Sequence, residues 1–372
     1  MKSGTVRIGT LAGIPLELHF TWAIIFALLA WSLATGYFPR AVPDLPTGSY
    51  WSKGVLAALL LFASILAHEL GHALVARREG VKTQRIVLFA FGGVAELKAE
   101  PPGPGPEFRI AVAGPAVSAI LFLGFALLAG ALSERPGAAA VMAYLEMLNG
   151  IVVLFNLIPA FPLDGGRILR AALWRFWGDF PRATRAAAGA GRLFAYFLIV
   201  GGIFGLLSGR TGGALWQLLI GLFLLQAAQS SSAQVWLKEA LSGLRVRDLM
   251  VAEPVAVPAH IPVSDAIRDY FLRYGYGGFP VERAGQVVGL LELAQVKAVP
   301  PEERDQVSVQ AVALPVEGSV RTVPGSDAVE ALQQMLQGGH GRMLVFEGET
   351  FKGLLTHTGV TRLLQIKMAL RA

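Results

Sequence analysis

Six long apolar stretches before residue 237 constrain the fold of this chain more than any other feature. A helix that crosses a bilayer needs about 20 mostly apolar residues. The stretch "IAVAGPAVSAILFLGFALLAGALS" has no charged residue along its whole length, which disfavours buried helices of a soluble protein. We therefore predict a polytopic α-helical membrane protein with about six spanning helices, at residues 18–38, 54–76, 110–133, 139–160, 193–209 and 213–235.

Lysine and arginine are concentrated in the connectors that share one side of the membrane with the amino terminus. The connectors of the opposite side carry only Arg40, Lys53, Arg135 and Arg210. By the positive-inside rule, both termini of this multi-pass protein of the cell membrane are predicted to be cytoplasmic. The first apolar stretch has no convincing cleavage site and is interpreted as a retained span. The net charge of +6 is explained by lipid head groups, so no nucleic-acid partner is expected.

The character of the chain changes after residue 237. Residues 238–372 alternate short β-branched runs with charged amphipathic stretches, which is typical of a soluble α/β module. The module also repeats itself: "GGFPVERAGQVVGLL" aligns with "GRMLVFEGETFKGLL", and Gly289 precedes Gly353 by 64 positions. We predict a membrane domain at 1–235, a linker at 236–246, and two similar units at 247–305 and 306–372.

A His-Glu-x-x-His motif lies inside the second apolar stretch, within "ILAHELGHALVARREG". Residues four apart share one face of a helix, so His68 and His72 can hold one metal ion while Glu69 reaches a water bound to it. Ionisable residues are costly within a membrane and therefore tend to be functional there. The spacing fits Zn²⁺ chemistry, and the chain has no cysteine that could form a competing site.

A catalytic zinc ion usually takes three protein ligands, so a third one is expected. The acids of the membrane half near the spans or the motif are few: Glu17, Glu96, Glu146 and Asp164. The spacing of soluble metalloproteases favours Glu96. Asp164 is the better candidate because Pro159 and Pro162 must unwind the fourth span just before it. The alternative role for Asp164 is a helix N-cap, which does not exclude ligation.

The pairing of "HELGH" with "NLIPAFPLDGG" resembles the site-2 protease family of intramembrane zinc metalloproteases, over residues 1 to about 235. The pieces "GIPLELHFTW", "FGGVAEL" and "AGPAVS" add to the resemblance. It implies that His68, His72 and Asp164 bind one zinc ion per chain and that Glu69 is the catalytic base. It also implies that Asn156 holds the substrate or the oxyanion. The expected activity is hydrolysis of peptide bonds within or near transmembrane segments of membrane proteins, which are the expected partners together with the bilayer.

Two further segments of the membrane half leave alternatives open. His19 matches a position that is often histidine in relatives, but an interfacial residue is an equal interpretation. Residues 85–97 alternate enough to form a strand pair, which either offers an edge to an unwound substrate or is a hairpin without substrate contact. Residues 100–107, "EPPGPGPE", are interpreted as a stiff connector, which is either a gate hinge or simply a loop.

The cytoplasmic repeat resembles a tandem pair of CBS domains, over residues 245 to about 370. The resemblance implies binding of an adenosine nucleotide, but the chain departs from the pattern. Thr356 is present in "LLTHTGV", yet Gly359 stands where an acidic residue would bind the ribose, and "LLELAQV" in the first repeat has neither. Dimerisation of two chains through the pair, or a purely structural role, is the alternative.

A different class of function is a CBS-regulated metal-ion transporter or channel, since six spans with polar residues could form an ion pathway. An ion pathway needs ligands distributed along a route. The ligands predicted here converge on one point with a base beside it, which favours the protease.

Overall fold

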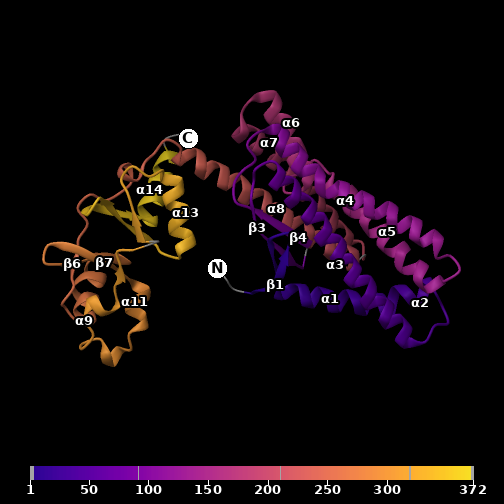
Figure 1. Ribbon diagram of the computed structural model, residues 1–372, viewed down its shortest axis with the longest axis horizontal. Helices are drawn as coiled ribbons and strands as arrows, with labels where there is room; N and C mark the ends of the chain where they lie inside the picture. Colours follow the sequence, from indigo (N-terminus) through magenta and orange to yellow (C-terminus); the bar gives the residue numbers. More distant parts are fainter. Residues whose placement is uncertain (1–3, 91, 210, 318–319, 370–372) are drawn as a thin grey trace. The chain divides into compact units, whose positions relative to one another are not determined.

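The computed structural model describes residues 4–90, 92–209, 211–317 and 320–369, and it divides the chain into two compact units, 1–233 and 234–372 (Figure 1). Six helices in the described residues are long and apolar enough to cross a membrane, which confirms the predicted number. They cover Phe20–Ala41, Thr47–Arg78, Pro104–Ala131, Pro136–Asn156, Phe180–Leu207 and Gly212–Ser230.

The helices of the first unit follow the chain in order. They are α1 (Phe20–Ser32), a π-helical turn (Leu33–Tyr37), α2 (Phe38–Ala41), α3 (Thr47–Arg78), α4 (Pro104–Ala131), α5 (Pro136–Asn156), α6 (Asp164–Trp177), α7 (Phe180–Leu207) and α8 (Thr211–Leu241). Figure 1 shows α3, α4 and α5 running side by side, and α4 packs against both neighbours and against α6.

Several helix boundaries differ from the ranges predicted from hydropathy. Helix α3 begins at Thr47 and not at residue 54, and α4 begins at Pro104 and not at residue 110. The fourth span was expected to reach residue 160, but α5 ends at Asn156, before Pro159 and Pro162. The fifth was expected to begin near residue 193, but α7 begins at Phe180, where Asp179 caps the helix by accepting a hydrogen bond from the Arg182 amide. Hydropathy detects only the apolar part of a helix, whereas the caps determine its ends.

A four-stranded sheet accompanies the helices of this unit. Its strands are β1 (Thr5–Leu11), β2 (Ile14–His19), β3 (Thr83–Phe89) and β4 (Gly92–Leu97), in that spatial order. The β2–β3 pair is parallel and the other pairs are antiparallel, so the strand pair predicted over residues 85–97 is confirmed as β3 and β4. Within the described residues β4 pairs with β3 alone and is therefore an edge strand.

The second unit contains two sheets with the same pairing pattern. The first consists of β5 (Val257–Pro258), β6 (Gly278–Arg283), β7 (Gln286–Glu292) and β8 (Leu314–Pro315), and the second of β9 (Arg321–Thr322), β10 (Arg342–Glu347) and β11 (Thr350–Thr356). The helices are α9 (Val263–Ala266), α10 (Leu272–Tyr274), α11 (Leu293–Ala298), α12 (Val309–Val312), α13 (Ala328–Gly338) and α14 (His357–Ala369). In each sheet a short parallel strand precedes an antiparallel hairpin.

The two glycines that marked the repeat occupy equivalent places in these hairpins. Gly289 lies opposite Val281, and Gly353 lies opposite Val345. A Cβ on Gly289 would lie 2.6 Å from the Leu314 carbonyl oxygen, and one on Gly353 would overlap the carbonyl of Val251. Each glycine therefore allows the segment that leads into one repeat to lie against the hairpin of the other.

The segment predicted as a linker, 236–246, is largely structured. Helix α8 continues to Leu241, and Leu241 and Val246 are fully buried in the apolar core of the second unit.

Candidate metal centre

Three potential metal ligands converge inside the first unit. Helix α3 presents His68 and His72 one turn apart, and α6 begins with Asp164; all three are buried. The two Nε2 atoms lie 3.2 Å apart, and each lies 3.2 Å from one carboxylate oxygen of Asp164. With bonds of about 2.0–2.1 Å, the ligand atoms of a tetrahedral zinc ion lie about 3.3 Å apart. The observed spacing fits that polyhedron.

Helix α4 supplies the hydrogen bonds that orient both imidazoles. His72 Nδ1 lies 2.7 Å from the Ile110 carbonyl oxygen, and His68 Nδ1 lies 2.9 Å from Ser118 Oγ. A carbonyl only accepts, so His72 Nδ1 must donate, which leaves the lone pair of the neutral ring on Nε2. Such outer partners are characteristic of metal-bound histidines because they fix the tautomer and the ring orientation.

Gly114 lies between Ile110 and Ser118 on α4. Because it has no side chain, the space in front of the histidine Nε2 atoms stays open. A Cβ at this position would lie 2.5 Å from His68 Nε2 and closer still to His72 Nε2. These separations are close to metal–nitrogen bond lengths, so a side chain at 114 would occupy the place that an ion needs. The donor set and the available space both fit zinc.

Glu69 lies beside this group and contacts the edge strand. Its carboxylate accepts a hydrogen bond of 3.1 Å from the Ala95 amide of β4. A Cβ on Gly93, also in β4, would lie 2.5 Å from Glu69 Cγ, so the strand approaches this side chain closely. The structure therefore places the predicted base between the histidine helix and an edge strand.

Comparison with known proteins gives the family of the chain. The model of peptidase family M50 matches residues 56–134 and 133–201, and that of the CBS domain matches residues 246–299. Rip3 of Mycobacterium tuberculosis, which carries the name of a zinc metalloprotease, is 38% identical over 366 residues, or 97% of this chain and 93% of Rip3. The chain belongs to peptidase family M50.

A second relative of this M50 protein agrees. Zinc metalloprotease MJ0392 of Methanocaldococcus jannaschii is 30% identical over 362 residues, which cover 97% of this chain and 96% of the relative. The solved site-2 protease from Methanocaldococcus jannaschii is 34% identical, with a TM-score of 0.43, and covers 61% of this chain and 95% of its own. The M50 protein is a multi-pass intramembrane zinc metalloprotease with a CBS domain, and the transporter alternative is not favoured.

The other predicted residues lie in recognisable places in this M50 protein. Asn156 is the last residue of α5, and residues 157–163 form an irregular strap that ends at Asp164. Asp164 is the first residue of α6, and Leu163 is the N-cap of that helix. The alternative role predicted for Asp164, that of the N-cap, therefore belongs to Leu163. Glu96 and Glu17 both pair with Arg85, away from the histidines.

His19 has a structural role. It is the N-cap of α1, where its Nδ1 accepts from the Thr21 amide at 3.4 Å and lies 2.8 Å from the Thr21 hydroxyl.

Three features of the site were not found from the sequence of the M50 protein. These are Ile110 and Ser118, which hold the histidines, and Glu107, which binds two arginines of α6. The sequence spacing could have revealed Ile110 and Ser118, because residues 110, 114 and 118 are four apart and share one face of α4. Glu107 could not be found in this way, because we predicted that it lies in a connector, whereas α4 begins at Pro104.

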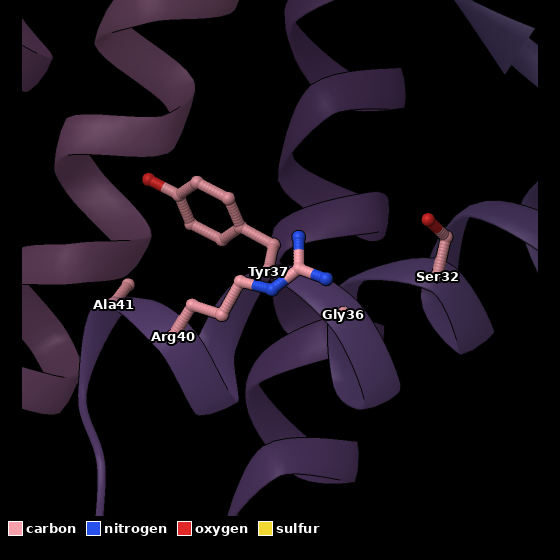
Figure 2. A pocket seen from close by; sticks show the side chains of 5 residues that line it. All are labelled: Ser32, Gly36, Tyr37, Arg40 and Ala41. Carbon is pink, nitrogen blue, oxygen red and sulfur yellow. The ribbon is translucent and has the colours of Figure 1, made fainter. Parts of the chain in front are cut away.

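A pocket of about 460 Å³ lies elsewhere in the same unit. Figure 2 shows its lining by Ser32, Gly36, Tyr37, Arg40 and Ala41, in the segment between α1 and α3. Gly54 of α3 packs against Ala34 beside it. Since Gly54 precedes His68 by 14 residues, or about 21 Å along a helix, this pocket is separate from the metal centre.

Proposed function

We propose that His68, His72 and Asp164 hold one zinc ion per chain and that Glu69 is the catalytic base of the protease. The observation that carries this proposal is the mutual spacing of 3.2 Å between the three ligand groups. The tautomer of His72 adds support. Because Nδ1 carries the hydrogen, the lone pair of the ring is on Nε2, which lies near the other two ligands.

A bound zinc ion would lower the pKa of a water ligand to about 7 and polarise the carbonyl of the peptide. Glu69 takes the proton from the attacking water and later delivers it to the leaving amine. Its position one residue after His68 on α3 puts the carboxylate next to the ligand group, and the Ala95 amide holds it there. The side-chain amide of Asn156 is assigned the role of binding the oxyanion or the substrate. Asn156 is the last residue of α5, directly before the strap that leads to Asp164.

The substrate is a transmembrane segment of another protein. An intact helix hides its carbonyls in internal hydrogen bonds, so the segment to be cleaved must unwind first. Strand β4 is positioned to receive it as an added strand, because it is an edge strand and contacts Glu69 through Ala95.

The active site is assigned to the cytoplasmic side of the cell membrane, together with both termini and the CBS pair. Six spans return the chain to the side on which it began. The basic connectors lie on that side, which supports a cytoplasmic orientation.

The CBS pair is assigned a regulatory role, with an adenosine nucleotide or a second chain as its partner. In the second repeat the Thr356 hydroxyl accepts from the Gly359 amide at 3.0 Å, so it is engaged in capping α14. At the corresponding point of the first repeat, Glu292 is buried and bonds to the Gly341 amide at 3.0 Å. These contacts within the chain already engage the two positions, which disfavours nucleotide binding there. Titration of the full chain with AMP and ATP, and its mass in detergent, distinguish the two roles.

The test of the catalytic assignment is cleavage of a single-span model substrate by the purified, zinc-loaded chain in detergent. Glu69→Gln is compared with the native chain at equal zinc content and should lose about 10²–10⁴-fold in rate. Glu79→Gln, at the end of the same helix, is the matched control and should cleave normally. Equal cleavage by native and Glu69→Gln chains would exclude Glu69 as the base. If both retain zinc without cleaving, zinc flux in vesicles tests the transporter alternative.

A further inference from the structure

A cluster of three charged residues joins α4 to α6 inside the first unit. Glu107, in the first turn of α4, is fully buried and accepts hydrogen bonds from Arg170 at 2.6 Å and from Arg167 at 3.2 Å. Arg170 is also buried, at 6% exposure. A carboxylate and a guanidinium this deeply buried must be paired, because each is strongly destabilised when alone.

The cluster lies immediately after the predicted metal ligand. Arg167 and Arg170 follow Asp164 by three and six residues, which are neighbouring positions on one face of α6. Helix α6 has only 14 residues, and its first residue is Asp164 itself. Any shift or rotation of α6 relative to α4 would therefore move the Asp164 carboxylate relative to the histidines, whose rings α4 also holds.

Arg170 extends the connection to the strap and to α7. Its guanidinium carbon lies 5.0 Å from the ring centre of Phe161 in the strap and 4.9 Å from that of Phe180 in α7. Cation–π contacts of this kind are stronger when they are desolvated. Glu107 thus fixes, through one arginine, the strap that leads into Asp164 and the helix that begins with it.

A contribution to stability alone does not explain why ions lie at this place. Buried ion pairs are often no more stabilising than apolar side chains of the same volume, since both charges lose their hydration. This pair is also incompletely satisfied: Glu107 Oε2 and Arg170 Nε are buried without a hydrogen-bond partner among the described residues. What the cluster does supply is a fixed point of attachment between two helices, because Arg167 and Arg170 of α6 both bond to one oxygen, Glu107 Oε1 of α4.

We propose that Glu107 is a positioning residue of the metal centre: through Arg167 and Arg170 it holds α6 where the Asp164 carboxylate reaches the ion. This inference rests on the proposed ligand set. Substitution of residues that orient metal ligands typically weakens metal affinity by about 10–100-fold. We expect a loss of that size in zinc affinity when the Glu107 carboxylate is removed.

The test measures zinc affinity of the full chain in detergent by competition with a chromophoric chelator. Four proteins form a cycle: native, Glu107→Gln, Asp164→Asn and the double variant. Glu107→Gln should bind zinc about 10–100-fold more weakly than the native chain. In the Asp164→Asn background it should have no further effect, because the ligand that it positions is already lost. Glu79→Gln is the control, since Glu79 also pairs with an arginine, but with Arg109 of α4 and not with those of α6.

Each other outcome overturns a specific statement. Native zinc affinity in Glu107→Gln, with weak binding in Asp164→Asn, overturns the positioning role alone. An equal loss in both backgrounds means that Glu107 acts on the histidines or on the fold, which also overturns it. Native affinity in Asp164→Asn overturns the proposed ligand set instead. If Glu107→Gln does not fold, Glu107→Asp takes its place, since it keeps the charge and withdraws the carboxylate by one methylene.

Discussion

The two units of the chain differ most in the polar side chains that they bury. Among the described residues, nearly all buried polar side chains belong to the membrane unit: Ser64, His68, His72, Glu107, Ser118, Asn149, Asp164, Arg170 and Thr184. The second unit buries only Glu292 and Thr322 among its described polar residues. Exposed large apolar side chains are also more frequent in the membrane unit, where Leu127, Leu154 and Leu207 are more than 70% exposed, although Leu272 of the second unit is exposed to a similar extent.

This difference follows from the surrounding solvent. In water, apolar burial drives folding, so the residues inside the CBS unit are determined mainly by the volume and shape of the core. In lipid, apolar side chains gain little by turning inward, and a polar group in the interior must have partners or a function. In the membrane unit, then, the buried histidines and charged residues identify the site. A small steric change should affect chemistry in the membrane unit and stability in the CBS unit.

Gly114→Ala should produce the largest effect of this comparison. The added Cβ would lie 2.5 Å from His68 Nε2 and nearer to His72 Nε2, in the space assigned to the ion. We expect zinc affinity to fall by more than about 100-fold, beyond the usual range for outer-shell changes, because the ligand space itself is filled. Metal content after dialysis and chelator competition measure it.

The same helix offers a matched control for this substitution. A Cβ on Gly124 meets no atom within 4 Å. Gly124→Ala should therefore keep native zinc binding, and it should slightly favour the helix. If Gly114→Ala binds zinc like Gly124→Ala, the ion does not lie against α4 and the proposed site is wrong.

Leu344→Ala applies a steric change of the opposite kind, a truncation, to the CBS unit. Leu344 is fully buried in a core between the two sheets, so its truncation should cost about 2–5 kcal/mol. Hydrogen exchange in β6, β7, β10 and β11 measures the local free energy of unfolding, and zinc content should stay native. Leu336→Ala, at an exposed site of α13, should change stability by less than about 0.5 kcal/mol. Loss of zinc in Leu344→Ala would contradict the separation of chemistry and stability between the units.

Local patterns made part of the site predictable. His68, Glu69 and His72 share one helix, so their spacing alone placed them together. Asp164 could be found because Pro159 and Pro162 mark the end of a helix at membrane depth. The structure then brought it to the histidines, 96 residues away along the chain.

The remaining parts of the site depend on contacts that no local pattern records. Ser118 is 50 residues from His68, and Glu107 is 63 residues from Arg170. Neither contact follows from spacing, since each requires the packing of α4 against α3 and α6. The CBS fold was more accessible because the sequence contains it twice, and the 64-residue offset of Gly289 and Gly353 is matched by the offset of Val281 and Val345 opposite them.

The smallest expected effect concerns a surface charge of the CBS unit, where water weakens electrostatic interactions. Arg268 donates two hydrogen bonds of 2.9 Å to the Asp269 carboxylate, and these lower the pKa of Asp269 below its ordinary value. A carboxylate with a lowered folded-state pKa stabilises the fold above its unfolded pKa, and this contribution disappears as the pH falls through the folded value.

Asp269→Asn should therefore unfold slightly more easily than the native chain at neutral pH and identically in acid. Thermal unfolding of both proteins between pH 7 and pH 2 measures this convergence. Arg268→Gln should produce a difference of the same sign and at least the same size, because it removes the partner of Asp269 and also the hydrogen bond of 2.8 Å to Asp265. Zinc affinity should stay native in both variants, since the pair lies in the unit that does not contain the metal centre. A difference that grows as the pH falls would show that the ionised pair destabilises the CBS unit, which would reverse the expected sign.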